Sequence, residues 1–200
     1  MKYGNLIKKL IVAIIGNILL GLGIALTSKG GFGVDVTVAF SYVMAPKLNV
    51  TFGQMTAITN AVLVAIVLFI YPKNLGISTI LVAFGNQYPL DFFNNLIPYI
   101  DIFWVRVVML TLGIVITALG AAIIIRSDLG MGIYEAFVFA FSKRFEKKYV
   151  LCKYACDSVF LIMVIILRGP LGVGTIASYA FTGLCIDFFN KYFEKIIRFE

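Results

Sequence analysis

The chain has 200 residues, of which 61% are hydrophobic and 14% are charged, and its formal net charge is +7 at pH 7. A soluble domain is about half apolar and about a quarter charged, so this composition excludes a water-facing globular surface. The positive charge does not indicate nucleic-acid binding, because the lysines and arginines stand at the ends of apolar runs, as they do beside membrane helices. The composition predicts an all-α integral membrane protein.

Six apolar runs are long enough to cross a bilayer, whose hydrocarbon core of about 30 Å takes about 20 helical residues. These runs are Leu10–Ser28, Gln54–Tyr71, Ile77–Ile97, Phe103–Ile125, Tyr149–Leu167 and Gly172–Phe193. Two shorter apolar segments, Val34–Ala45 and Ile133–Phe141, are too short to cross. The sequence therefore predicts about six transmembrane helices and two short helices, which are either re-entrant or interfacial.

The second half of the chain repeats the first. One set of residues recurs 99 positions later, from Leu20-Gly21, Gly31 and Gly33 to Leu119-Gly120, Gly130 and Gly132. A second set recurs 96 positions later, from Asp91-Phe92-Phe93-Asn94 to Asp187-Phe188-Phe189-Asn190. Because glycines and polar residues recur together, shared hydrophobicity does not explain the match. We interpret residues 1–98 and 99–200 as two membrane repeats of three spans each within one membrane domain.

The distribution of positive charge gives an orientation. A repeat with an odd number of spans inverts the repeat that follows it. With the N-terminus in the cytoplasm and Lys153 set aside because it falls within a span, twelve lysines and arginines fall on the cytoplasmic side and four fall on the opposite side. This bias follows the positive-inside rule. It predicts a multi-pass protein of the cell inner (plasma) membrane with both termini in the cytoplasm.

Two glycine-rich breaks each follow a full span and precede a short segment. Gly31 and Gly33 lie in the first break, and Gly130 and Gly132 lie in the second. A helix that begins at such a break presents free N–H groups and the positive end of its dipole. In transporters with inverted repeats, two such breaks meet near the membrane midplane and hold the substrate. The alternative is a pair of tight turns at the membrane surface.

Ionisable and polar residues inside the apolar segments are candidates for function, because their insertion into a membrane costs free energy. Lys153 and Asp157 are four residues apart on one span, so we expect a structural ion pair. Asp91 and Asp187 are the carboxylates that the repeat duplicates, and the alternative for them is a role in capping or anchoring helix ends. The candidate substrate-binding residues are Gly31, Gly33, Asp35, Asn86, Asp91, Gly130, Gly132, Glu135 and Asp187.

The repeated motifs resemble the YczE/YyaS/YitT group of small bacterial membrane proteins. The resemblance is carried by Gly21-Leu22-Gly23-Ile24-Ala25-Leu26, Gly31-Phe32-Gly33-Val34-Asp35, Gly172-Val173-Gly174-Thr175 and Ile186-Asp187. The group often has Pro-Trp-Asp after the first glycine break, where this chain has Val34-Asp35. The resemblance implies a multi-span protein of the inner membrane and implies no settled activity.

We expect a small-solute transport protein or a solute-binding membrane subunit. The alternative is a non-transporting accessory or assembly factor for a membrane-associated biosynthetic or secretion system. The expected partners are the lipid bilayer and a small solute that the sequence does not identify. An importer that uses ATP would also need a partner membrane or ATPase subunit, since the chain has no nucleotide-binding motif.

Enzymatic activity is not expected, because the chain has no histidine and no serine or cysteine has an evident base partner. No cofactor is expected. A metal site is also not expected, because histidine ligands are absent and the cysteines are too few and too scattered. The three cysteines, Cys152, Cys156 and Cys185, are interpreted as small buried hydrophobic residues.

Overall fold

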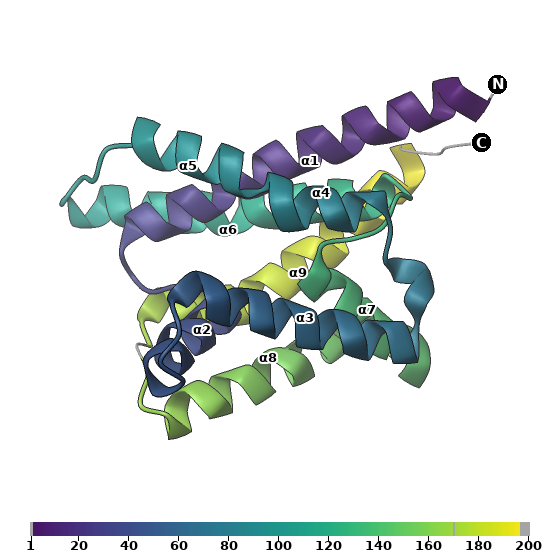
Figure 1. Ribbon diagram of the computed structural model, residues 1–200. Coiled ribbons are helices and arrows are strands. Elements are labelled where there is room, and N and C mark those ends of the chain that lie inside the picture. The colour runs from purple at the N-terminus through teal and green to yellow at the C-terminus, as the bar shows by residue number, and fades with distance from the viewer. Residues whose placement is uncertain (1, 170, 197–200) are drawn as a thin grey trace.

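The computed structural model describes residues 2–169 and 171–196, and in this part of the chain every regular element is a helix (Figure 1). Long and short helices alternate in a similar order in the two halves of the chain. The elements are α1 (Lys2–Gly30), α2 (Val36–Lys47), α3 (Phe52–Ile70), the 3-10 helix η1 (Pro72–Asn74), α4 (Ile77–Gly85), α5 (Gln87–Leu96), α6 (Phe103–Arg126), α7 (Ile133–Phe145), α8 (Tyr149–Ile166) and α9 (Val173–Ile196).

Four of the described helices are long and apolar enough to cross a membrane. They are Asn5–Gly30 within α1, and the whole of α3, α6 and α8. Their outer faces carry large apolar side chains, such as Phe69, which is 92% exposed, and Ile166, which is 73% exposed. A face of this kind is stable against lipid and not against water. The prediction of a helical membrane protein is therefore confirmed, and the fifth and sixth spans remain predictions.

The two remaining predicted spans have different shapes. The run Ile77–Ile97 is divided between α4 and α5, with Asn86 between them. The break has a local cause, because Pro89 has no N–H to donate to the carbonyl of Gly85, four residues earlier. The run Gly172–Phe193 instead forms one continuous helix of 24 residues, α9.

The helices α1 and α6 form a close antiparallel pair through glycines. A Cβ atom added to Gly23 would lie 2.4 Å from the backbone nitrogen of Thr117, and one added to Gly120 would lie 2.7 Å from the carbonyl oxygen of Gly16. Small residues let two helix backbones approach in this way, and such contacts drive helix association in membranes. On the outside of the pair, α5 packs against α1 and α9 packs against α6.

The helices α2, α3, α7 and α8 form a second group beside this pair. The helix α2 packs against α3 and α8, and α7 also packs against α3 and α8. In Figure 1, α7 lies toward the end of the bundle that holds the first turn of α1 and the last turn of α9, and α2 lies toward the opposite end. The short helices are α2, with 12 residues, and α7, with 13. The helix α7 is longer than the predicted Ile133–Phe141 because it continues through a polar last turn.

Candidate functional site

A buried ion pair lies on α8, within the second helix group. Lys153 is 3% exposed and Asp157 is 1% exposed, and the Nζ atom of Lys153 lies 2.8 Å from Oδ2 of Asp157. Both residues are on α8, where a spacing of four residues places them on one face of the helix. A buried pair of this kind must satisfy its remaining hydrogen-bonding groups through neighbours.

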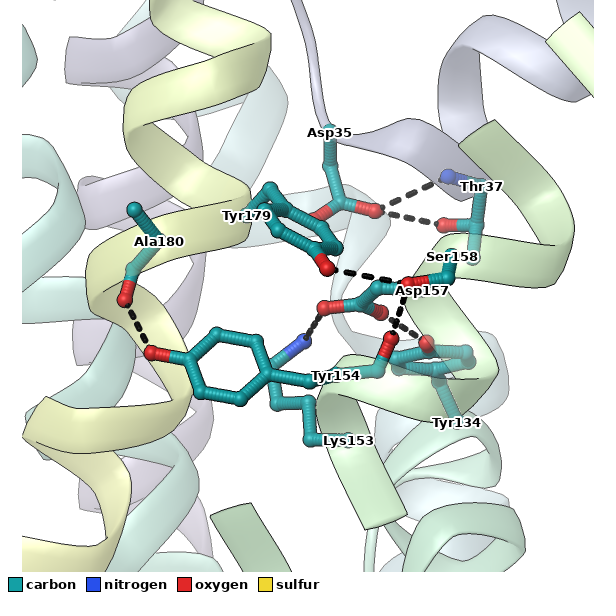
Figure 2. A network of polar contacts seen from close by, with 9 residues as sticks. All are labelled: Asp35, Thr37, Tyr134, Lys153, Tyr154, Asp157, Ser158, Tyr179 and Ala180. Carbon is teal, nitrogen blue, oxygen red and sulfur yellow. Dashed lines mark hydrogen bonds and ion pairs between the residues drawn. The ribbon is translucent and has the colours of Figure 1, made fainter. Parts of the chain in front are cut away.

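Tyr134 on α7 completes the surroundings of Asp157. Its hydroxyl donates a hydrogen bond to Oδ1 of Asp157, so both carboxylate oxygens are bound. The ring of Tyr134 also lies beneath the Lys153 ammonium, 4.9 Å from Nζ to the ring centroid. Figure 2 shows Tyr134 and Lys153 on either side of Asp157. Tyr134 therefore holds both members of the pair in place.

Two more carboxylates approach the pair from the first turns of the short helices. Asp35 is the N-cap of α2, where Oδ1 accepts hydrogen bonds from the backbone N–H of Thr37 at 3.0 Å and from its hydroxyl at 2.8 Å. Glu135 lies in the first turn of α7. The Lys153 ammonium interacts electrostatically with both of these carboxylates as well as with its ion-pair partner. Three carboxylates therefore act on the charge of one ammonium group, and one of them, Asp157, is in contact with it.

Tyr149 adds a hydroxyl group that has no partner. Its side chain is nine-tenths buried, and its hydroxyl makes no hydrogen bond within the described part of the chain. It interacts electrostatically with Glu135, Asp157 and Asp187. Leaving a buried polar group without a hydrogen bond costs about 1–3 kcal/mol. A bound solute is one way to satisfy it.

The helix α9 is joined to α8 by hydrogen bonds between side chains and from a side chain to the backbone. The hydroxyl of Tyr154 donates to the carbonyl oxygen of Ala180 at 2.6 Å, and Oγ of Ser158 lies 2.9 Å from the hydroxyl oxygen of Tyr179 (Figure 2). These bonds join two helices at the level of the Lys153–Asp157 pair. The orientation of α8, and with it the position of the ion pair, is set by this contact.

A small polar cavity lies on the other side of Tyr134. Its volume is about 50 Å³, and it lies between α2 and α3. Six of its eight lining residues have hydroxyl or amide side chains. The polar lining residues are Thr37, Ser41, Thr56, Thr59, Asn60 and Tyr134. The cavity has room for a water molecule or for a compact head group.

A larger hollow runs between α3 and α8 and is almost entirely apolar. Its volume is about 500 Å³, within the range of ligand pockets in general. Aromatic side chains from α2, α7 and α8 form part of its wall, namely Phe40, Phe137, Phe141 and Phe160. We call this hollow the apolar groove. Thr59 and Leu63 line both the apolar groove and the polar cavity, so the two are neighbours.

The structure brings only some of the predicted site residues together. Lys153 interacts electrostatically with Asp35, Glu135 and Asp157. Asp91, in contrast, is exposed on α5. Asp187 pairs with Lys191 at 2.7 Å on α9 and reaches the cluster only through its electrostatic interaction with Tyr149. The amide oxygen of Asn86 is buried at the α4–α5 break without a hydrogen-bond partner among the described residues.

The four predicted glycines determine the backbone conformation and packing beside the site. The carbonyl of Gly31 accepts from Arg106 at 3.1 Å. Gly33 and Gly130 have positive φ angles and pack against the residues that begin α9 and α4. Gly132 is the N-cap of α7, where an added Cβ would meet the carboxylate of Glu135. They position the first turns of α2 and α7, and no glycine among them lines the polar cavity.

Two tyrosines of the site were not predicted from the sequence. Tyr149 could have been found, because it stands four residues before Lys153 and therefore lies on the same face of α8 as the ion pair. Tyr134 gives a weaker signal, since its only mark is its position next to Glu135. Tyrosine is common at the ends of membrane helices. A tyrosine that belongs to a buried cluster therefore cannot be told from an interfacial one by sequence alone.

Residues 7–191 match a family that is described as a family of unknown function (DUF6198). The chain belongs to this family. It is 27% identical over 177 residues to the uncharacterized membrane protein YczE of Bacillus subtilis (strain 168), covering 86% of this chain and 81% of that protein. It is 24% identical over 185 residues to the uncharacterized protein YyaS of the same organism, covering 90% of this chain and 92% of that protein.

These comparisons confirm the resemblance to YczE and YyaS that the sequence motifs predicted. No solved structure matches the chain. Inferences about function therefore depend on the geometry of the site.

Proposed function

We propose that this protein binds a small solute at the cluster around Lys153 and Asp157 and moves it across the inner membrane, as a transporter or as the solute-binding subunit of one. One observation carries the proposal. The first turns of two short helices, one from each half of the chain, approach the same buried ion pair within an otherwise apolar bundle. Ionisable groups at membrane depth are costly, and they mark solute and ion pathways.

An inverted repeat is part of this proposal, and backbone conformation supports it. Six of the seven residues with positive φ angles among the described residues form three pairs, and each pair is separated by 97 residues. The pairs are Gly31 (φ 66°) with Asp128 (φ 56°), Gly33 (φ 120°) with Gly130 (φ 110°), and Asn49 (φ 53°) with Glu146 (φ 53°). Such conformations are uncommon, above all outside glycine, so their recurrence at one spacing favours a duplicated unit.

Contacts between the halves support the same symmetry. The N–H of Gly174 donates to the carbonyl of Phe32 at 2.8 Å, and the N–H of Ser78 donates to the carbonyl of Leu129 at 2.9 Å. Each bond joins a glycine break in one half to the start of a helix in the other half. Exchanging the halves turns one bond into the other, as expected for two units related by a pseudo-two-fold axis.

The short helices are proposed to be re-entrant. Asp35 at the start of α2 interacts with Asp157, the ninth of the 18 residues of α8, whereas Val43 near the end of α2 packs against Gly169 beyond the end of α8. The helix α2 therefore runs from mid-bundle back toward one end. At 1.5 Å per residue its 12 residues span about 18 Å, too short to cross a membrane.

The proposed topology has six crossings, by α1, α3, α4–α5, α6, α8 and α9. An even number of crossings agrees with the position of the first turn of α1 and the last turn of α9 at the same end of the bundle (Figure 1). The charge bias of the sequence places that end in the cytoplasm. Under this topology α2 enters from the outer side and α7 from the cytoplasmic side.

A thermal-shift screen of the purified protein against metabolites tests the proposal. A solute that binds only the folded protein raises its melting temperature, by mass action. We expect a stabilising metabolite whose effect disappears in Asp157→Asn and persists in Asp128→Asn, a control at an exposed ion pair with Lys9. A metabolite effect that is equal in both variants would place binding elsewhere.

The alternative, a non-transporting accessory or assembly factor, is favoured by the apolar groove, which a helix of a partner protein could enter. The two functions predict opposite sensitivities in cells. If the protein is an accessory factor, a bulky residue in the groove, Val159→Trp, abolishes the phenotype, while Asp157→Asn weakens it only as far as it lowers the level of the protein in the membrane. If it is a transporter, Asp157→Asn abolishes the phenotype even when the variant reaches normal levels in the membrane.

A further inference from the structure

We infer that the solute is an amphiphilic cation, with a compact charged head at the polar cluster and an apolar body in the groove between α3 and α8. This inference rests on the proposed function and names the class of solute. Two independent features lead to it, the surplus of negative charge in the cluster and the direct contact between the cluster and the apolar groove.

The first feature is the surplus of negative charge in the cluster. The single ammonium of Lys153 interacts electrostatically with three carboxylates, and it is already bound to one of them, Asp157, at 2.8 Å. Glu135 has no ion-pair contact among the described residues. The N-termini of α2 and α7 each contribute about half a positive charge, which offsets part of the surplus and leaves a net negative site. An anionic solute would add a fourth negative charge, whereas a cation neutralises the site.

The unpaired hydroxyl of Tyr149 indicates where a head group gains a further hydrogen bond. Tyr149 is nine-tenths buried, its hydroxyl has no hydrogen-bond partner among the described residues, and it interacts electrostatically with Glu135 and Asp157. An ammonium head has three donors, which carboxylate and phenol oxygens can accept. A bare metal ion fits less well, because no three of the described Asp, Glu, Cys or His side chains are grouped closely enough to hold one. The cluster therefore suits an organic cation.

The second feature is the wall that the cluster shares with the apolar groove. The ring of Tyr134 packs against Phe137 and Phe160, with centroids 6.3 and 6.1 Å apart, and both of these residues line the groove. The hydroxyl of the same tyrosine binds Asp157. One side chain thus has its apolar edge on the groove and its polar end in the cluster, so a molecule that contacts both must itself be amphiphilic.

The dimensions of the groove fit an alkyl chain or a ring system of the solute. Its lining on α3 runs from Met55 to Ile66, about 16 Å along the helix at 1.5 Å per residue. The polar cavity beside it, at about 50 Å³, admits only a compact head. A phospholipid with an anionic head group meets neither the charge of the cluster nor the size of the polar cavity that borders it at Tyr134. A primary amine on an alkyl chain meets both.

Equilibrium binding of four matched probes to the protein in nanodiscs tests the inference. Octylammonium carries head and chain, octanol has the chain without charge, octanoate reverses the charge, and methylammonium has the head without the chain. With binding to empty nanodiscs subtracted, we expect octylammonium to bind about tenfold or more tightly than each of the others. Equal binding of octanol or octanoate would overturn the cationic head. Equal binding of methylammonium would overturn the apolar body.

Two variants with matched controls locate the probe. Glu135→Gln removes one negative charge and Val159→Trp fills the groove, and each should weaken octylammonium binding about tenfold. Glu146→Gln removes an exposed charge at the end of α7, and Ile162→Trp introduces the same side chain on α8 outside the groove lining, so neither should change binding. Unchanged melting temperatures show that a variant is folded. Equal losses in a variant and its control would overturn the location.

The inference and the proposed function fail in different ways. If octylammonium does not bind, but the metabolite screen finds a hydrophilic ligand that needs Asp157, the amphiphile is wrong and solute binding stands. If octylammonium binds as expected, but crosslinking residues in the groove capture only a protein helix in cells, the groove serves a partner and the inference is overturned. If no ligand depends on Asp157, both are wrong.

Discussion

At the scale of single residues, the buried Lys153–Asp157 pair makes the core sensitive to the loss of either partner. Removing one partner of a buried ion pair leaves an uncompensated charge and costs about 3–5 kcal/mol. We predict that Lys153→Met lowers the free energy of unfolding by about this amount and that the double variant Lys153→Met/Asp157→Leu recovers most of it. Unfolding in mixed micelles measures both values. A double variant as unstable as the single one would show that the pair is needed for folding itself.

The two tyrosines of the site should respond in opposite ways. Tyr134→Phe removes a donor to Asp157 and should lower the free energy of unfolding by about 1–3 kcal/mol. Tyr149→Phe removes a buried hydroxyl that has no partner, so it should leave stability unchanged or raise it, while weakening solute binding. Melting temperatures with and without ligand separate the two effects. A destabilised Tyr149→Phe variant would mean that its hydroxyl has a partner in the unliganded protein.

Part of the site could be predicted at this scale, for a physical reason. Asp35, Glu135, Lys153 and Asp157 are ionisable residues in or beside apolar runs, where their cost makes them conspicuous. Asp91 looked equivalent by the same criterion. Its position is decided by packing, because Pro89 and Leu90 contact α1 at Gly21, and this contact leaves Asp91 exposed. A sequence pattern shows that a polar residue is costly, but not which face of the helix a neighbour covers.

At the scale of elements, the α1–α6 contact depends on glycine. A Cβ atom at Gly23 would overlap the backbone of Thr117 at 2.4 Å, and backbone cannot move aside as a flexible side chain can. Gly23→Val should therefore separate the helices and cost about 1–3 kcal/mol. Gly53→Ala is the control, since nothing lies within 4 Å of its Cβ. Abundance in the membrane and melting temperature should fall only for Gly23→Val, and equal behaviour would argue against close packing.

The helices themselves were largely predictable, because the length of each apolar run can be read directly from the sequence. The predicted runs Phe103–Ile125 and Tyr149–Leu167 differ from α6 and α8 by one residue at their C-terminal ends. The spacing of the repeat was not predictable from identities alone. Matching residues in the first span stand 99 positions apart, yet matching backbone conformations stand 97 apart. Backbone geometry is conserved by packing, whereas glycines in an apolar helix can match by coincidence at a neighbouring register.

At the scale of the whole molecule, the proposed orientation predicts which loops face the cytoplasm. The α7–α8 connection carries Lys147 and Lys148 and should be cytoplasmic, and the connection before α6, with Asp101, should be outside. Reporter fusions at these two loops and at both termini measure this. An external C-terminus would contradict the six-crossing, inverted-repeat arrangement, because an even number of crossings returns the chain to its starting side.

The central claim is that solute passes through the cluster around Asp157. Uptake from a defined metabolite mixture into proteoliposomes, read by mass spectrometry of the vesicle contents, tests it most directly. Wild-type protein should accumulate at least one solute above empty vesicles, and Asp157→Asn, folded and inserted to the same level, should not, while Asp128→Asn retains uptake. Uptake by Asp157→Asn at the wild-type rate, or contents indistinguishable from empty vesicles for the wild-type protein, would contradict the account.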